Sequence, residues 1–580
     1  MYLCAMSVTV ARTAGFCWGV RRAVDRVVTE IKKGDAPFRV YGPLVHNPQV
    51  IEALRDRGVA TCSEPWDEKG GTLFLRTHGV TVEERERLSR LNLKLKDLTC
   101  PRVGRALSIS MKMASKGYDV LIFGDPGHHE VKAILSAAGP SGRVISSVEE
   151  AVELPELRKP FLLSQTTQNT REFRELLEAL RRRWPGIEFA ETICDSTAKR
   201  QKELRELMDK ADAVVIVGGR NSANTGRLAS IAGETGLPVF RVETHEELDP
   251  EALAGYRRVL LSAGASTPEW SIRKVRERLL EIQGQSSGAG WIRSAFRNLV
   301  FSGAHIPLIA LFLALAQGVT IGGHGWARAG LAAGFLLWSF TSFTAVLECR
   351  RITITSQKRQ EFIRSHEGLM LFLAGGGLAL AMVVSWGLGT VWMVWTAVAV
   401  LSCILYALPL IQENQFFDFL RRIPGSREVL FTVAWGFLVC VLPSVILAGM
   451  DFGPRLLVWP VSLAFLFFSR SLLIDLVDLQ GDALLGMDTL PIHLGAARCR
   501  AILLAAAGSA AVVQLAAVVL EGLPACAGGF ALAPALLAFA YLFLERSHFP
   551  SELWVRVLSD GSLLLAGLVP YLLCTIQGVS

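Results

Sequence analysis

The feature that most constrains this chain is a long stretch without charge. Residues 368 to 412 contain no Asp, Glu, Lys or Arg. About 20 apolar residues cross a bilayer as a helix, so this stretch is long enough to cross twice, with SWGLGT at 385–390 as the turn. Part of the chain is therefore predicted to lie in a membrane.

The same rule predicts nine membrane-spanning segments in the second half of the 580-residue chain. We place them near residues 299–321, 329–348, 369–386, 390–411, 429–449, 456–470, 500–520, 524–544 and 557–577. Arginines concentrate in the loops after the second and fourth segments, at Arg350, Arg351, Arg421 and Arg422. Because positively charged loops stay in the cytoplasm, we expect a multi-pass protein of the inner (cell) membrane with its C-terminus outside.

The first half has the pattern of a soluble domain. Strand-like apolar runs, glycine-rich loops and charged helical stretches alternate, as in TLFLRTHGV at 72–80 and AVVIVGGRNSANTGRL at 213–228. This alternation predicts an α/β fold with parallel strands. The segment at 283–292 is predicted to be a linker, so the expected domains are residues 1–282, the linker, and an all-α membrane domain at 293–580.

Two features limit where the first domain works and what it binds. Its N-terminus, MYLCAMSVTVARTAG, lacks the basic and long apolar regions of a cleavable signal peptide, and the 11 cysteines of the chain are scattered. We therefore expect this domain to stay in the reducing cytoplasm. The formal net charge of +7 is small for this length and gives no argument for a nucleic-acid partner.

Three cysteines lie in turns at nearly equal intervals: Cys17 in GFCWGV, Cys100 in LTCPRV and Cys194 in TICDST. This spacing predicts three similar lobes, each donating one thiolate to a shared centre. Thiolates in a cytoplasmic protein suit zinc or an iron–sulfur cluster, and three ligands rather than four leave one position open to a substrate. The alternative is that all three are small buried apolar residues.

Polar side chains in other turns are typical of phosphate binding. His46, His78 and His128 follow strand-like runs, and GGRNSANTGRL offers Ser222 and Asn224 at the start of a helix. Such groups donate hydrogen bonds to phosphate oxygens. Each histidine taken alone is more often structural than a ligand, and one glycine-rich turn is weak evidence.

Taken in order, these motifs resemble those of one family. Residues 10 to about 280 resemble the LytB/IspH family, 4-hydroxy-3-methylbut-2-enyl diphosphate reductase, through GFCWGV, VHNPQV, RTHGV, DLTCP, GHHEV, SQTTQNT, ICDSTAKRQ, GGRNSANT and SAGAST. The resemblance implies a three-lobed, pseudo-threefold α/β fold around a [4Fe–4S] cluster. Cys17, Cys100 and Cys194 would hold this cluster.

The resemblance also implies the roles of other residues. The diphosphate would be held by His46, His78, His128, Ser222, Asn224 and Ser266. Glu130 would supply the proton that lets the hydroxyl group leave as water, through the hydroxyl of Thr166. Two electrons from a ferredoxin or flavodoxin type of partner would then yield isopentenyl and dimethylallyl diphosphate. Two positions depart from the family: Ala223 replaces a frequent serine, and His129 a frequent proline.

A second group of candidate residues lies in the membrane half. Asp475, Asp478 and Asp482 are spaced i, i+3 and i+7, which predicts one face of a helix that could hold Mg²⁺ and a diphosphate. The alternative is a solvated acidic helix end.

With the nearby sequences GDALLGMDTLPIHLG and YALPL, residues 293–580 resemble the UbiA family of intramembrane prenyltransferases. The family's first aspartate-rich motif is eroded here to Thr344, Glu348 and Ile352.

The expected protein is therefore an iron–sulfur reductase of isoprenoid biosynthesis fused to a prenyltransferase-like membrane domain. The half-kept motifs predict that this domain binds a prenyl diphosphate or lipid, with weakened or altered transferase activity. The alternative is a membrane prenyltransferase whose iron–sulfur domain is a regulatory diphosphate sensor. A third possibility is a membrane half that serves only as an anchor.

Overall fold

The structure is a computed structural model that describes residues 7–34, 36–65, 70–285, 290–351, 357–411, 426–451, 453–477, 479–485, 489–546 and 550–579. The chain divides into two compact units. The first unit comprises Met1–Ser287 with Ala483–Gly486, and the second comprises Gly288–Asp482 with Met487–Ser580.

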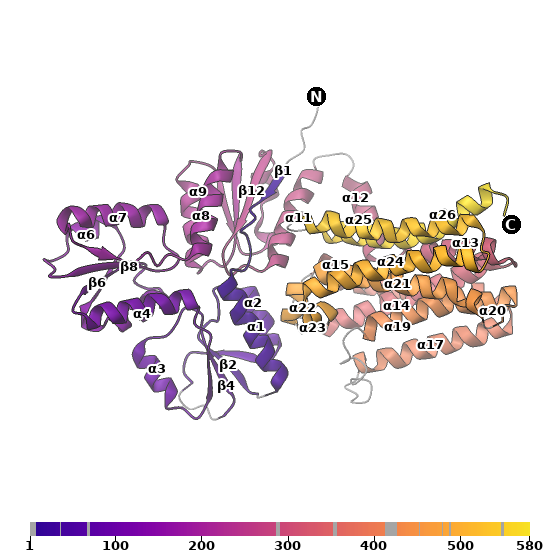
Figure 1. The fold of residues 1–580 in the computed structure, drawn as a ribbon, viewed down its shortest axis with the longest axis horizontal. Helices are drawn as coiled ribbons and strands as arrows, with labels where there is room; N and C mark the ends of the chain where they lie inside the picture. The colour runs from indigo at the N-terminus through magenta and orange to yellow at the C-terminus, as the bar shows by residue number, and fades with distance from the viewer. Residues whose placement is uncertain are drawn as a thin grey trace. The chain divides into compact units, whose positions relative to one another are not determined.

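The first unit contains three separate four-stranded parallel sheets, which form three lobes (Figure 1). The first has the order β1 (Ser7–Val10), β12 (Arg258–Ala263), β10 (Ala213–Val217), β11 (Val239–Val242). The second has the order β3 (Val59–Cys62), β2 (Phe38–Tyr41), β4 (Thr72–Leu75), β5 (Lys94–Asp97). The third has the order β7 (Gly142–Ile145), β6 (Asp119–Phe123), β8 (Pro160–Ser164), β9 (Glu188–Phe189). The predicted three-lobed α/β fold is confirmed.

Helices connect the strands of these sheets. They are α1 (Trp18–Lys33), α2 (Pro48–Asp56), α3 (Val82–Ser89), α4 (Pro101–Ser115), α5 (His129–Ala138), α6 (Val148–Val152), α7 (Thr170–Arg183), α8 (Asp195–Met208), α9 (Ala223–Gly233), α10 (Pro250–Leu253) and α11 (Glu269–Gln285), with short 3₁₀ turns η1 (Gly139–Ser141) and η2 (His245–Glu247). Central strands such as β10 are buried along their whole length, because helices cover both faces of a parallel sheet. Their near-continuous apolar sequences follow from this burial.

The register of the parallel strands brings their C-terminal ends together. In the first sheet Val217 at the end of β10 lies opposite Val242 and Ala263 at or near the ends of β11 and β12. Loops that follow the strands therefore emerge at one edge, together with the N-termini of the next helices. This edge is where each lobe presents its polar turns.

The second unit consists of helices, most of which run side by side (Figure 1). They are α12 (Gly290–Phe301), α13 (Ile306–Ile321), α14 (Trp326–Arg351), α15 (Lys358–Ser365), α16 (Glu367–Trp386), α17 (Thr390–Ile411), α19 (Ser426–Trp435), α20 (Leu442–Ala448), α21 (Pro454–Val477), α22 (Leu479–Leu485), α23 (Leu490–Leu494), α24 (Ala496–Leu520), α25 (Leu532–Arg546) and α26 (Glu552–Ile576). A π-helical segment η3 (Gly436–Val441) joins α19 to α20, and a 3₁₀ segment η4 (Ala525–Ala531) precedes α25.

Within the described residues, six helices are long and apolar enough to cross a membrane, and a bent pair raises this number to seven. Each of the nine predicted spans falls on helical residues, but the predicted count of nine is not confirmed. The first span is interrupted between α12 and α13, which meet at 68°, where Gly303 has a φ of +72° and Pro307 stands in the first turn. The fifth is divided by the π-helical segment and Pro443.

A disulfide bond joins Cys526 in η4 to Cys574 near the end of α26. Sequence spacing gave no signal for this pair, because the two residues are 48 positions apart. Cys17, Cys100 and Cys194 are free thiols in the structure.

Candidate active site

The three predicted cluster cysteines each precede a helix of a different lobe. Cys17, Cys100 and Cys194 are the N-cap residues of α1, α4 and α8. A helix N-terminus carries partial positive charge and free N–H groups, which stabilise an anionic sulfur. The backbone N–H of Val20 donates to Cys17 Sγ at 3.4 Å. The lobes therefore direct three equivalent thiol positions toward one place.

All three cysteines line one cavity of about 100 Å³ in the first unit. Gly19 keeps this space open, because a Cβ at that position would lie 2.6 Å from Cys100 Sγ and 3.9 Å from Cys17 Sγ. Burial raises the pKa of Cys100 and Cys194, opposed by backbone N–H groups at the starts of α4 and α8. A bound metal supplies the positive charge that deprotonates such thiols. The donor set and the cradle at Gly19 therefore fit a cluster with three thiolate ligands.

Three histidines form a second wall of the same cavity. The ring centroid of His46 lies 4.4 Å from that of His78 and 5.6 Å from that of His128. Burial lowers the pKa of His46 and His128 to about 4 and holds the pKa of His78 well below its usual value. The three imidazoles are therefore neutral at pH 7, each with one N–H to donate.

The histidine geometry favours an anion over a metal ion. One ring nitrogen from each of the three lies within 4.8 Å of the others, a spacing from which a metal site can form. However, His128 caps α5, and its Nδ1 accepts the backbone N–H of Glu130 at 3.2 Å. A neutral His128 therefore carries its proton on Nε2, which makes that atom a donor to a ligand oxygen and not a metal ligand.

Several buried polar atoms around this wall have no hydrogen-bond partner within the described chain. They are His46 Nε2, His78 Nδ1, and both Oδ1 and Nδ2 of Asn224. Asn224 is in the first turn of α9, whose N-cap is Ser222, and both line the cavity with Ser266. Buried polar atoms are normally satisfied, so the site is built for a polar ligand. The helix N-terminus and the donors favour an anionic one.

Glu130 is buried against the same cavity, at 1% exposure. Its Oε1 accepts the backbone N–H of Thr166 at 2.6 Å and its Oε2 accepts the Thr166 hydroxyl at 2.9 Å. Burial raises the pKa of Glu130 to about 7, although both hydrogen bonds from Thr166 lower it. An acid with this pKa is poised to give up a proton near neutral pH.

The cavity thus brings together every residue predicted for the first domain: Cys17, Cys100, Cys194, His46, His78, His128, Glu130, Thr166, Ser222, Asn224 and Ser266. Ala223 also lines it, at the first position of α9. His129 stacks on His46 with ring centroids 6.1 Å apart.

Sequence reasoning missed three residues near the cysteines. Gly19 and Thr167 line the cavity, and Arg200 is buried in α8, six residues after Cys194. Each lies within a recognised motif, GFCWGV, SQTTQNT or ICDSTAKRQ, so the signal was present. What the sequence did not reveal was how closely their atoms approach the centre.

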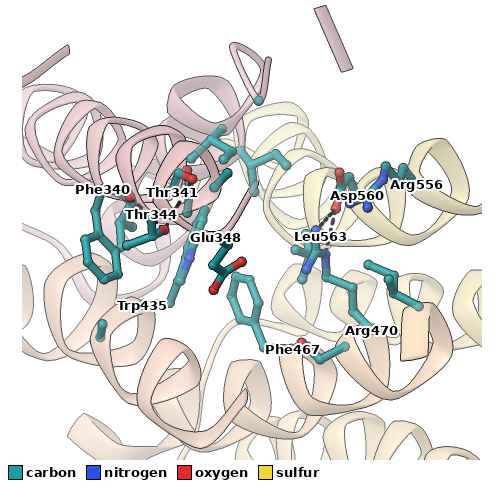
Figure 2. A pocket seen from close by; sticks show the side chains of 18 of the residues that line it. Phe340, Thr341, Thr344, Glu348, Trp435, Phe467, Arg470, Arg556, Asp560 and Leu563 are labelled. Carbon is teal, nitrogen blue, oxygen red and sulfur yellow. Dashed lines mark hydrogen bonds and ion pairs between the residues drawn. The ribbon is translucent and has the colours of Figure 1, made fainter. Parts of the chain in front are cut away.

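The second unit contains a larger cavity of about 510 Å³. Apolar side chains such as Trp395, Trp435 and Phe467 line much of it, and its volume lies in the range of small-molecule sites. Figure 2 shows Thr341, Thr344 and Glu348 coming from α14 and Arg556 and Asp560 from α26. Ionisable residues within membrane helices are rare unless they serve a polar ligand or pathway.

The predicted aspartates are divided between two helices in this cavity. Asp475 lies in α21 and Asp482 in α22, and both line the cavity with Glu348 and Thr344. Asp478 and Ile352 lie outside the described residues. The structure therefore describes two of the three predicted carboxylates. They lie on two consecutive helices, α21 and α22, and not on one.

Basic residues of this cavity are held by acidic ones. Asp560 accepts from Arg470 Nε at 2.6 Å and lies 2.9 Å from His305 Nε2 (Figure 2). Arg556 Nε donates to Glu552 at 2.9 Å. These pairs tie α13, α21 and α26 together at the polar part of the cavity.

The fold and the first cavity define an α/β protein of three lobes whose cysteines are arranged to hold a metal cluster. Residues 8–280 match the family model described as LytB protein. A 4-hydroxy-3-methylbut-2-enyl diphosphate reductase from Anaeromyxobacter sp. (strain Fw109-5) is 38% identical over 293 residues, which make up 50% of this chain and 99% of that protein. The chain belongs to the LytB family.

Solved structures resemble each half of the chain. The structure of the E-1-hydroxy-2-methyl-but-2-enyl-4-diphosphate reductase from Plasmodium falciparum is 27% identical, covers 47% of this chain and 87% of its own, and has a TM-score of 0.46. The apo structure of a UbiA homolog from Aeropyrum pernix K1 is 15% identical, covers 45% of this chain and 95% of its own, and has a TM-score of 0.32.

Proposed function

We propose that the first unit reduces 4-hydroxy-3-methylbut-2-enyl diphosphate to isopentenyl and dimethylallyl diphosphate. The observation that carries this proposal is the single cavity that contains three cysteines, three neutral histidines and the buried acid Glu130. Membership of the LytB family, whose relatives carry that name, supports it.

The histidine wall and the start of α9 bind the diphosphate. His46, His78 and Asn224 each present a buried polar atom without a hydrogen-bond partner among the described residues, so a phosphate oxygen supplies the missing hydrogen bonds. Because the nearby anion stabilises imidazolium, diphosphate binding raises the pKa of the histidines. The histidines thus become positively charged, and complementary to the diphosphate, when the ligand binds.

Cys17, Cys100 and Cys194 hold a [4Fe–4S] cluster, which when bound supplies single electrons and a Lewis-acidic iron. The reaction consumes two electrons and two protons. The carbon–oxygen bond breaks, the hydroxyl takes one proton and leaves as water, and the carbon skeleton takes the other. A ferredoxin or flavodoxin type of protein delivers the electrons.

Glu130 supplies the proton for the departing hydroxyl group. Hydroxide is a poor leaving group, so an acid must act as the bond breaks. The Thr166 hydroxyl touches the Glu130 carboxyl at 2.9 Å and lines the cavity, which makes it the relay between the acid and the substrate.

The binding part of this proposal is tested by Asn224→Ala in the full chain. The loss of hydrogen bonds to a charged ligand should raise KM about tenfold or more, with a smaller change in kcat. Asn221→Ala is the matched control, because Asn221 is an exposed asparagine of the same loop and should leave KM unchanged. Equal KM values for both variants would contradict the assignment.

For the second unit, we propose that the cavity of about 510 Å³ binds a prenyl diphosphate or a related anionic lipid, with weakened or altered transferase activity. The carboxylates of Asp475 and Asp482 provide oxygen ligands for Mg²⁺, and the apolar wall accommodates the chain. The replacement of the first acidic motif by Thr344 and Glu348 is the reason to expect reduced catalysis.

Magnesium-dependent binding of farnesyl diphosphate to the detergent-solubilised chain tests this second role. Asp475→Asn should weaken the magnesium-dependent component at least several-fold, and Asn224→Ala, which acts on the first cavity, should not. Transfer of a prenyl chain to an acceptor that is abolished by Asp475→Ala would contradict the weakened-activity version. Absence of magnesium-dependent binding would leave the membrane half as an anchor.

We also propose that the first unit faces the cytoplasm of a cell whose inner membrane holds the second unit. The end of α14 that carries Arg350 and Arg351 is assigned to the cytoplasmic side by its charge. In this topology Cys526 and Cys574 lie on the other side of the membrane, where an oxidising compartment favours their disulfide. Free thiols at Cys17, Cys100 and Cys194 fit a reducing compartment.

A further inference from the structure

Arg200 is a buried cation that forms no ion pair with a carboxylate of the described residues. Its side chain belongs to α8 and is 3% exposed. Its guanidinium donates from Nη2 to the carbonyl oxygen of Gly15 at 2.5 Å, and from Nη1 to the carbonyl oxygen of Ser196 at 3.2 Å and to the Ser196 hydroxyl. Its Nε is buried without a hydrogen-bond partner among the described residues.

Among the described residues, Glu203 is the carboxylate that acts on Arg200, and both of its oxygens already accept hydrogen bonds. The donors are the backbone N–H groups of Arg12 and Thr13, at 2.8 Å. Glu203 therefore acts on Arg200 at a distance and is not a hydrogen-bond partner of it among the described residues. Burial of a charge is costly in free energy, and an opposite charge nearby lowers that cost. The other groups that act electrostatically on Arg200 are the thiols of Cys17 and Cys194.

The contacts of Arg200 join the two segments that carry these cysteines. Gly15 precedes Cys17 by two residues, and Ser196 follows Cys194 by two residues. The guanidinium therefore contacts both segments that carry Cys17 and Cys194. Its hydrogen-bond acceptors among the described residues are all neutral. The cluster that the first unit is proposed to hold, with three thiolates, carries a net charge of about −1, and about −2 after one-electron reduction.

We propose that Arg200 is the buried counter-ion of the iron–sulfur cluster and that its charge favours the reduced state. The inference rests on the proposed function only for the presence of the cluster. Since each added electron increases the attraction to a fixed cation in a medium of low dielectric constant, the cation stabilises the reduced cluster more than the oxidised one. Arg200 acts on the reaction through the charge of the cluster, so it is a positioning residue and not a catalytic one.

The test is an anaerobic redox titration of the cluster in the full chain without substrate, followed by electron paramagnetic resonance. In Arg200→Gln the ratio of reduced to oxidised cluster at a fixed potential should fall about tenfold, equivalent to about 59 mV for a one-electron couple. Arg200→Lys keeps the charge but not the fork of hydrogen bonds, and should stay within about threefold of the wild-type ratio. If Arg200 served only to join two segments by hydrogen bonds, Arg200→Lys should change the ratio as much as Arg200→Gln does.

Arg102→Gln is the matched control. Arg102 also lies beside a cluster cysteine, but its side chain is 45% exposed and paired with Asp195 at 2.5 Å, so removal of its charge should change the ratio less than twofold. Iron and sulfide content of every variant shows whether the cluster is loaded.

An unchanged ratio in a loaded Arg200→Gln chain, or a shift in Arg200→Lys as large as in the glutamine variant, overturns the proposal. If the glutamine variant loads no cluster, the lysine variant alone decides. A wild-type chain with a cluster but without turnover would contradict the reductase function and leave this redox test intact.

Discussion

At the scale of single residues, Glu130 connects burial to chemistry. The two hydrogen bonds from Thr166 stabilise its carboxylate, yet burial raises the pKa to about 7. The outcome is a carboxylic acid that is largely protonated just below neutral pH and still within reach of a relay hydroxyl. Sequence alone identified the residue through its motif, but not this balance.

Replacement of Glu130 by Gln should lower kcat by about 10²- to 10⁴-fold, because the amide keeps the shape of the side chain but cannot donate the proton. Single-turnover measurements with a pre-reduced chain check this, since they separate the chemical step from electron delivery. Glu149→Gln, at an exposed site in α6, should leave kcat unchanged. A Glu130→Gln chain with wild-type turnover would show that another group donates the proton.

The pH dependence of kcat/KM should have its basic limb near pH 7. The acid must be protonated to act, so the rate is highest below the pKa of about 7 in the free chain and falls as pH rises through it. In Thr166→Val the carboxylate loses the hydroxyl donor, so its pKa rises and the limb moves to higher pH. A profile that is flat from pH 6 to pH 9, or a limb that moves to lower pH in Thr166→Val, contradicts this role for Glu130.

At the scale of elements, three helix N-termini make the centre. Cys17, Cys100 and Cys194 cap α1, α4 and α8, and each follows a strand from a different sheet, β1, β5 and β9. The equal spacing of the cysteines predicted the three lobes. The closeness of Gly19 to Cys100 depends on how segments far apart in the sequence pack together, which no local pattern encodes.

Gly19→Ala should reduce cluster loading strongly. Its Cβ would lie 2.6 Å from Cys100 Sγ, so the cysteine must move away from the shared centre. Gly104→Ala is the matched control on a helix beside the same site, because a Cβ there meets nothing within 4 Å. Iron and sulfide counts after reconstitution measure the difference, and equal loading of the two variants would contradict the geometry.

The membrane helices show which features hydropathy does not predict. Hydropathy placed nine spans on helical residues, but Gly303 and Pro307 break the first, and the π-helical segment with Pro443 divides the fifth. Apolar composition records the length of a segment and not its straightness, so local backbone breaks pass unnoticed. The Cys526–Cys574 disulfide was missed for a similar reason, since it depends on how α26 packs against η4.

At the scale of the whole molecule, the described cysteines of the first unit are free thiols, and the second unit contains the Cys526–Cys574 disulfide beside free Cys349, Cys440 and Cys499. The disulfide fits the non-cytoplasmic side of the proposed topology. Because Cys526 and Cys574 are buried, the orientation is tested with cysteines introduced at exposed positions. A membrane-impermeant maleimide applied to intact spheroplasts should label Gln577→Cys, at the exposed C-terminal end of α26, and should label Glu149→Cys, at an exposed site of the first unit, only after lysis. Labelling of Glu149→Cys but not of Gln577→Cys in intact spheroplasts would reverse the proposed orientation.

The most direct test of the central claim uses the full chain, purified anaerobically in detergent. Iron and sulfide are counted, and oxidation of a reduced one-electron dye is followed when 4-hydroxy-3-methylbut-2-enyl diphosphate is added. The account predicts about four irons per chain and substrate-dependent oxidation that Cys100→Ser abolishes. A loaded cluster without turnover would favour a diphosphate sensor, and a chain that binds no iron would contradict the account altogether.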